Sequence, residues 1–199
     1  MRAILQLPRR ANYAEYLAVE RQSGHRHELI DGVIVAMAGG SDEHNAIAGR
    51  FATLLGVRLA KGCRYYTPDQ RFWIPAQARG RYSDGSIICG KPEHPPHDAQ
   101  ASTNPVIVIE VLSPSSEGDD DGDKRIDFQS LPSLKAYVLA TQDERRVKVY
   151  RRTTDGGWHS APDAYGDADR FELPTLTPAV SIAELYDDIL DPSGRSLLR

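Results

Sequence analysis

Three carboxylates and one lysine are the residues of this chain best suited to metal-assisted chemistry. Glu110 ends the apolar run VIVI, and Asp84 stands just before an apolar pair in the segment RYSDGSIIC. Lys124 follows in the segment DDGDK, and Glu28 lies upstream, before an Asp-Gly pair. A carboxylate at the end of an apolar strand is costly to bury unless it binds a metal, a proton or a partner. Glu110 is therefore a candidate site residue.

These residue types fit the hydrolysis of a phosphodiester. Two carboxylates from neighbouring strands can share Mg²⁺, which prefers oxygen ligands. The cation would polarise a phosphoryl oxygen and lower the pKa of a bound water, and a nearby ammonium would favour the hydroxide. The alternative is a set of solvated charges, in which Glu110 faces water and Lys124 pairs with Asp120 or Asp127 along its helix.

The hydrophobic pattern predicts helices packed on a mixed β-sheet as the frame for these residues. Asn12 and Ser41 are helix-capping signals, and the Asp-Gly pair at 31–32 predicts a hairpin. The expected elements are a helix over 13–21, strands over 27–30 and 33–37, a helix from 41 to about 62, strands between 63 and 89, a strand over 106–109, a short helix over 123–129, strands over 134–140 and 146–151, and a last helical turn over 181–186. This order indicates an α/β or α+β fold.

The length, net charge and cysteine content of the chain limit the classes of protein to which it can belong. The chain length of 199 residues predicts a single domain over 1–199, with a core over about 13–186. The formal net charge of −4 argues against a broadly basic nucleic-acid coat. We expect no membrane span and no signal peptide, because no apolar run is long enough. Cys63 and Cys89 are interpreted as two half-buried thiols of a cytoplasmic protein, since they lack metal-ligand spacing.

Several of these segments resemble the bacterial Uma-two family of restriction endonucleases. The resemblance runs from about 13 to 186, and its segments are HELIDGVIVAMAGGSDEH, RYSDGSIIC, PVIVIEVLSPSS, DDGDK, LKAYVLA and VKVYRR. The block EVLSPS is the most specific of them. The resemblance implies the PD-(D/E)xK nuclease fold, in which helices flank a mixed sheet. It also implies dependence on Mg²⁺ or Mn²⁺, DNA as the substrate, and a homodimer.

The same resemblance implies roles for individual residues. Asp84 is similar to the aspartate of the first nuclease motif and Glu110 to the acidic residue of the second. Both would hold the metal, together with the backbone carbonyl of Val111. The lysine position of the second motif is Leu112 here, and Lys124 on the next helix would take its place.

Three further residues bear on this assignment. Glu28 resembles the accessory acid that related nucleases supply from their first helix. His44 matches a histidine frequent in the family, for which a structural role is the simpler interpretation. A literal Pro-Asp pair ends at Asp69, but the apolar strand that follows Asp84 favours Asp84 as the motif aspartate.

The segment 117–123 is acidic where relatives usually carry arginines. We interpret it as a flexible, solvated loop, because it lacks the EF-hand pattern. Its charge weakens the expectation of tight DNA binding, since phosphate contacts dominate nucleic-acid affinity. The leading hypothesis is a Mg²⁺-dependent endonuclease. The alternatives are a nuclease-fold binding or assembly module without catalysis, and a metal hydrolase acting on a small phosphorylated molecule.

Overall fold

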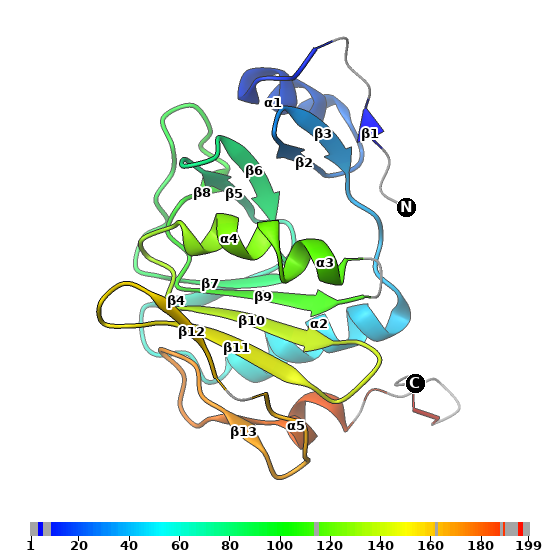
Figure 1. Ribbon diagram of the computed structural model, residues 1–199, viewed down its shortest axis with the longest axis vertical. Coiled ribbons are helices and arrows are strands. Elements are labelled where there is room, and N and C mark those ends of the chain that lie inside the picture. The colour runs from blue at the N-terminus through cyan, green and yellow to red at the C-terminus, as the bar shows by residue number, and fades with distance from the viewer. Residues whose placement is uncertain are drawn as a thin grey trace.

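The computed structural model describes residues 4–5, 9–113, 116–161, 163–187, 189 and 195–196. In these residues, two six-stranded sheets and one two-stranded ribbon pack with helices into the mixed α and β fold shown in Figure 1. The ribbon pairs β13 (Arg170–Phe171) with β14 (Val180–Ser181). Among the helices of the described residues, none combines the length and the apolar character that a membrane crossing requires.

The main sheet is mixed, because one neighbouring pair of its strands is parallel and the others are antiparallel. Its strands in spatial order are β12 (Trp158–Ser160), β11 (Val147–Arg152), β10 (Ala136–Thr141), β9 (Ile107–Leu112), β7 (Gly85–Cys89) and β4 (Cys63–Tyr66). The parallel pair is β9 and β10. A parallel pair needs a crossover connection, and here α3 (Glu117–Asp120) and α4 (Asp123–Gln129) provide it.

The side chains of β9 alternate between the two faces of the main sheet. Ile107 and Ile109 pack in a core with α2 (Asp42–Gly56) and α5 (Ile182–Tyr186), whereas Val108 packs with Phe128 of α4 on the other face. In Figure 1, α3 and α4 accordingly lie on one side of this sheet and α2 and α5 on the other. Because side chains alternate with a period of two, Glu110 lies on the face that α4 covers.

The second sheet has six strands, and the first helix packs against it. Its strands in spatial order are β1 (Ile4–Leu5), β3 (Val33–Ala36), β2 (His27–Ile30), β6 (Arg79–Tyr82), β5 (Arg71–Ile74) and β8 (Ala101–Ser102). Tyr16 and Leu17 of α1 (Tyr13–Gln22) pack against Leu29 and Ile34 of this sheet. The pattern predicted most of these strands but not that they form a separate sheet, because strand pairing depends on contacts far apart in the chain.

The local signals are confirmed by the structure. Asn12 forms a capping box at the start of α1. The hairpin of β2 and β3 turns at Asp31 and Gly32, both of which have positive φ. Ser41 caps α2, but the helix ends before the predicted Gly62.

Cys63 and Cys89 form a disulfide, which corrects the prediction of two separate thiols. The two residues lie opposite each other on the antiparallel strands β4 and β7, and their Cα atoms are 3.9 Å apart. The prediction was wrong because the register of these two strands, not the sequence spacing, brings the sulfur atoms together. The prediction of a reducing compartment was based on free thiols, so the disulfide removes that argument.

Candidate functional site

The four side chains proposed from the sequence line one cavity of about 420 Å³. Glu28 comes from β2, Asp84 from the junction between β6 and β7, Glu110 from β9 and Lys124 from α4. The other lining residues are 35–41, from the end of β3 to the residue before α2, and His44, Ser113, Ser116, Asp120 and Gln142. The cavity therefore lies where the chain passes from the second sheet into the main sheet, and both sheets contribute to it.

Strand register places Asp84 opposite Glu110. Gly85 pairs with Ile109 across the antiparallel strands β7 and β9, so the residues next to this pair also face each other. The Oδ2 atom of Asp84 accepts a hydrogen bond of 2.7 Å from the amide of Val111. Because the N–H and C=O groups of one strand residue point to the same side, the Val111 carbonyl is also directed toward the Asp84 side of β9.

Asp84 is held as an ionised carboxylate. Its Oδ2 atom accepts a second hydrogen bond from Nε2 of His44, at 3.1 Å. Burial by itself raises the pKa of Asp84, but the bonds from His44 and Val111 and the charge of Lys124 hold it below its usual value. Both hydrogen bonds go to Oδ2, and within the described part of the chain no hydrogen bond is made to Oδ1, which can take a further partner.

Glu110 and Lys124 form a buried ion pair beside Asp84. Glu110 is 1% exposed, and its Oε2 accepts a hydrogen bond of 2.9 Å from Nζ of Lys124. The same ammonium lies 3.3 Å from Asp120. Among the described residues, the Oε1 atom of Glu110 has no hydrogen-bond partner. It is one of nine buried side-chain polar atoms of the described residues that have no hydrogen-bond partner, and Nδ1 of His44 and Oδ1 of Asp120, in the same cavity, are two others.

The pKa values of Glu110 and Lys124 reflect their surroundings, in which carboxylates outnumber ammonium groups. Burial raises the pKa of Glu110 well above its usual range, and Asp84 and Asp120 raise it further against the opposing ammonium of Lys124. Burial by itself would lower the pKa of Lys124, but the neighbouring carboxylates raise it well above its usual value. Lys124 therefore remains a cation.

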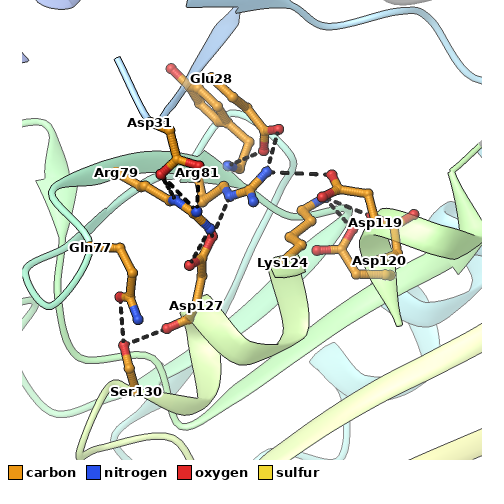
Figure 2. Close-up of polar contacts among 12 residues, drawn as sticks. Glu28, Asp31, Gln77, Arg79, Arg81, Asp119, Asp120, Lys124, Asp127 and Ser130 are labelled. Carbon is orange, nitrogen blue, oxygen red and sulfur yellow. Dashed lines mark hydrogen bonds and ion pairs between the residues drawn. The ribbon is translucent and has the colours of Figure 1, made fainter. Parts of the chain in front are cut away.

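The carboxylate of Glu28 is held by a fully buried arginine (Figure 2). Nη1 of Arg81 donates to Glu28 at 3.2 Å and to Asp119 at 3.4 Å, and its Nε donates to Asp127 at 2.7 Å. The other oxygen of Glu28 accepts from the amide of Tyr82. Arg81 on β6 thus ties the second sheet to α3 and α4, the segment that carries Lys124.

The acidic segment 117–123 is not the solvated loop that we predicted. It forms α3 and the start of α4, and Asp120 is 3% exposed. Each of three consecutive aspartates has a basic partner: Asp119 pairs with Arg81, Asp120 with Lys124, and Asp121 with Lys148. The prediction was wrong because these basic partners come from β6, α4 and β11, and the pairing depends on how those elements pack.

The donor atoms at this site fit a hard divalent cation. Mg²⁺ is usually bound through one or two carboxylates and keeps several waters. Asp84 Oδ1, the orphaned Oε1 of Glu110 and the Val111 carbonyl would form such a set. Among the described residues, no three His, Cys, Asp or Glu side chains are placed to enclose a metal, so a backbone carbonyl and water would have to complete the coordination.

Three other residues differ from the sequence-based interpretation or extend it. His44, for which a structural role was the simpler interpretation, lines the cavity and contacts Asp84. Asp120 also lines it, and the only sequence signal for Asp120 was its position one helical turn before Lys124. Asp69 of the literal Pro-Asp pair has a side chain that is 81% exposed, pairs with Arg26 and lines a different cavity.

One family model and two sequence relatives match most of this chain. Residues 13–184 match the family model Uma2, described as "putative restriction endonuclease". The uncharacterised Synechocystis protein slr1290 is 32% identical over 173 residues, which cover 86% of this chain and 89% of that protein. A second uncharacterised Synechocystis protein, sll1609, is 32% identical over 146 residues, covering 73% and 82% of the two chains.

A solved structure shows the same fold. It is described as a "putative nuclease belonging to DUF820" from Anabaena variabilis, and it matches with a TM-score of 0.68 and 16% identity over 86% of this chain and 97% of that one. At this identity the match shows a shared fold, which confirms the predicted mixed sheet flanked by helices. Together with the family match over 13–184, these findings confirm the resemblance seen in the sequence: the chain belongs to the Uma2 family.

Proposed function

We propose that this protein is a metal-dependent endonuclease that hydrolyses DNA phosphodiester bonds with Mg²⁺ or Mn²⁺. The observation that carries the proposal is the orphaned Oε1 of Glu110, buried beside the ionised Asp84 in the cavity that also holds Lys124. A buried carboxylate oxygen that accepts no hydrogen bond can serve as a ligand for a hard cation, because such cations take oxygen ligands. The family description and the shared nuclease-like fold support the same reaction class.

The metal would be held by Asp84, Glu110 and the carbonyl of Val111. A divalent cation bound there would polarise a phosphoryl oxygen of the substrate and lower the pKa of a bound water. His44 and the Val111 amide both donate to Oδ2, the other oxygen of Asp84.

Lys124 would stabilise negative charge on the phosphate and orient the attacking water. The carboxylates of Glu110 and Asp120 keep its ammonium protonated, so we assign it these roles rather than removal of a proton from water. Glu28 would support a water at the cavity wall, where Arg81 fixes its carboxylate. Asp120 would keep the ammonium of Lys124 within the site.

Substrate and assembly follow from the same proposal. Pairing of the acidic segment 117–123 with internal cations reduces its repulsion of a phosphate backbone, which removes one argument against DNA. Cutting both strands of a duplex favours two sites, so a homodimer remains our prediction. A cytoplasmic location also remains a prediction, now without support from free thiols.

The test is Mg²⁺ and Mn²⁺ titration followed by thermal unfolding, with plasmid and oligonucleotide cleavage measured on the same preparations. The wild type should be stabilised by metal and should cleave. The near-isosteric double variant Asp84→Asn/Glu110→Gln should lose both signals, with cleavage reduced by at least ~10²–10³-fold, the scale for removal of a group that stabilises the transition state.

Asp69→Asn is the matched control, because it removes the exposed aspartate of the literal Pro-Asp pair. We expect it to behave as wild type. If this control lost cleavage while the double variant retained it, the motif aspartate would be Asp69 and not Asp84. That outcome would overturn the proposed site.

A second candidate function is a nuclease-fold module without catalysis. The observation in its favour is that each candidate acid already has a basic partner within the protein: Asp84 with His44, Glu110 with Lys124, and Glu28 with Arg81. Such a site would be stable without a metal. This function predicts neither metal stabilisation nor cleavage in the wild type.

A further inference from the structure

His44 lies in the first turn of α2, where the chain enters the helix after two glycines. Its backbone amide donates to Oγ of the capping residue Ser41. Its imidazole lines the cavity, and the side chain is 17% exposed. Since the carboxylate of Asp84 has no proton to donate, Nε2 of His44 is the donor in their 3.1 Å hydrogen bond. The histidine therefore contacts a candidate ligand through one defined atom.

Two donors from different elements hold the same oxygen of Asp84. One is the Val111 amide on β9, and the other is His44 on α2. The terminal torsion of an aspartate is broad and roughly two-fold, so a carboxylate with a single hydrogen bond can rotate. Two donors on Oδ2 restrict that rotation and keep Oδ1 available beside Glu110.

The glycine at position 40 allows the imidazole to lie where it does. A Cβ atom at Gly40 would come within 2.5 Å of Nδ1 and 2.9 Å of Cγ of His44, which is closer than real Cβ contacts allow. A Cβ atom at the neighbouring Gly39 would meet nothing within 4 Å. The side-chain amide of Asn45 donates to the carbonyl of Gly40 and so holds the loop against the helix. The two glycines thus differ sharply in their relation to His44.

We propose that His44 is a positioning residue of the metal site, which orients Asp84 so that Oδ1 is presented to the cation. The proposal rests on the proposed metal site and adds a residue to it. Groups that orient metal ligands in this way typically change metal affinity or activity by 10–100-fold when they are removed. His44 acts on Asp84 and not on the substrate.

The experiment measures the affinity of the full-length protein for Mg²⁺ and Mn²⁺ alone, by calorimetry and by metal-dependent thermal unfolding, without DNA. We expect His44→Ala to weaken binding by roughly 10–100-fold. His44→Gln should stay within a few-fold of wild type, because its amide can donate from a similar position. Gly40→Ala should weaken binding as His44→Ala does, whereas Gly39→Ala should have no effect.

The variants separate positioning from the other roles of a histidine. Unchanged affinity in both His44→Ala and Gly40→Ala overturns the proposal. Tighter binding in both His44→Ala and His44→Gln also overturns it, since the imidazole would then act only as a competing cation. The thermal midpoint without metal shows whether each variant is folded, and Gly40→Ala provides a second test where His44→Ala does not fold.

The outcome for the wild type separates this inference from the proposed function. Wild-type protein that is folded but binds no metal overturns both. Wild-type protein that binds metal through Asp84 but does not cleave DNA overturns only the nuclease, and the affinity of His44→Ala then decides the role of His44 by itself.

Discussion

Two buried clusters of charged side chains in this protein lie beside cavities, and they differ in how completely their charges are paired. The site cluster contains Asp84, Glu110, Asp120, Lys124 and His44. The Arg71 cluster, on the second sheet, contains Tyr13, Glu20, Arg71, Tyr82 and Asp98. The cavity beside the Arg71 cluster is the larger one, at about 590 Å³ against about 420 Å³. Cavity size therefore does not distinguish the candidate site from the Arg71 cluster.

The pairing of charged groups does distinguish the two clusters. Every guanidinium nitrogen of Arg71 has a partner: Nε and Nη2 donate to Asp98, and Nη1 donates to Glu20 and Tyr82. In the site cluster, one oxygen of Glu110 has no partner among the described residues. The Arg71 cluster is closed, whereas the site cluster can still accept a cation.

One acid of each cluster, Asp98 and Glu110, shows the same difference in its pKa. Burial by itself raises the pKa of Asp98, but the bonds from Arg71, the amide of Gln100 and the hydroxyl of Tyr13 hold it below its usual value. The pKa of Glu110 is instead raised well above its usual range. A buried acid with an incomplete set of donors remains costly until a cation or a proton binds.

The largest effect, a loss of folding stability, is expected from removing the arginine of the Arg71 cluster. Arg71→Met leaves Glu20 and Asp98 buried without their cation, which should reduce the free energy of unfolding by about 3–5 kcal/mol. Denaturant unfolding measures this loss. Metal-induced stabilisation should persist in the folded variant, because the site cluster is untouched. A cost below about 1 kcal/mol would contradict the view that this cluster is structural.

Removing the cation of the site cluster should affect cleavage and metal binding in opposite directions. Lys124→Met should reduce DNA cleavage by roughly 10²-fold, since it deletes a group that stabilises charge in the transition state. The stabilisation gained on adding Mn²⁺ should exceed that of wild type, because Glu110 and Asp120 lose their internal cation. Metal titration followed by thermal unfolding checks this. A smaller gain than wild type would show that Lys124 helps to build the metal site.

Acidity should weaken metal binding through Glu110. The raised pKa means that this carboxyl keeps its proton to pH values above the usual 4.5, and a metal ligand must be deprotonated. Affinity for Mg²⁺ should therefore rise with pH, by at most about tenfold per pH unit for one proton released. Calorimetry over a pH series measures the slope. An affinity independent of pH above 4.5 would contradict the shift.

The smallest effect is expected at an exposed ion pair of the Arg79 side chain. Arg79 contacts both Asp31, which is 55% exposed, and Asp127, which is 1% exposed. Asp31→Asn should cost less than about 1 kcal/mol, as exposed pairs usually do. Asp127→Asn should cost more, because Arg81 also depends on that carboxylate. Equal losses in denaturant unfolding would show that burial does not separate these pairs.

The sequence by itself determined the local elements and the candidate acids. The capping box at Asn12, the turn at Asp31 and Gly32, and the apolar run before Glu110 depend on residues within a few positions of each other. Such signals act through backbone conformation and periodicity, so they remain legible in the chain. The resemblance of short segments then selected Asp84, Glu110 and Lys124, which the structure places in one cavity.

Only the tertiary structure decided how charges and strands are paired. The disulfide between Cys63 and Cys89, the separate second sheet, and the neutralisation of the acidic segment 117–123 all depend on which distant elements lie side by side. The contact between His44 and Asp84 is of the same kind, since it joins the start of α2 to the junction before β7. A charge in the sequence carries no record of its partner, because pairing is set by register and packing between segments far apart in the chain.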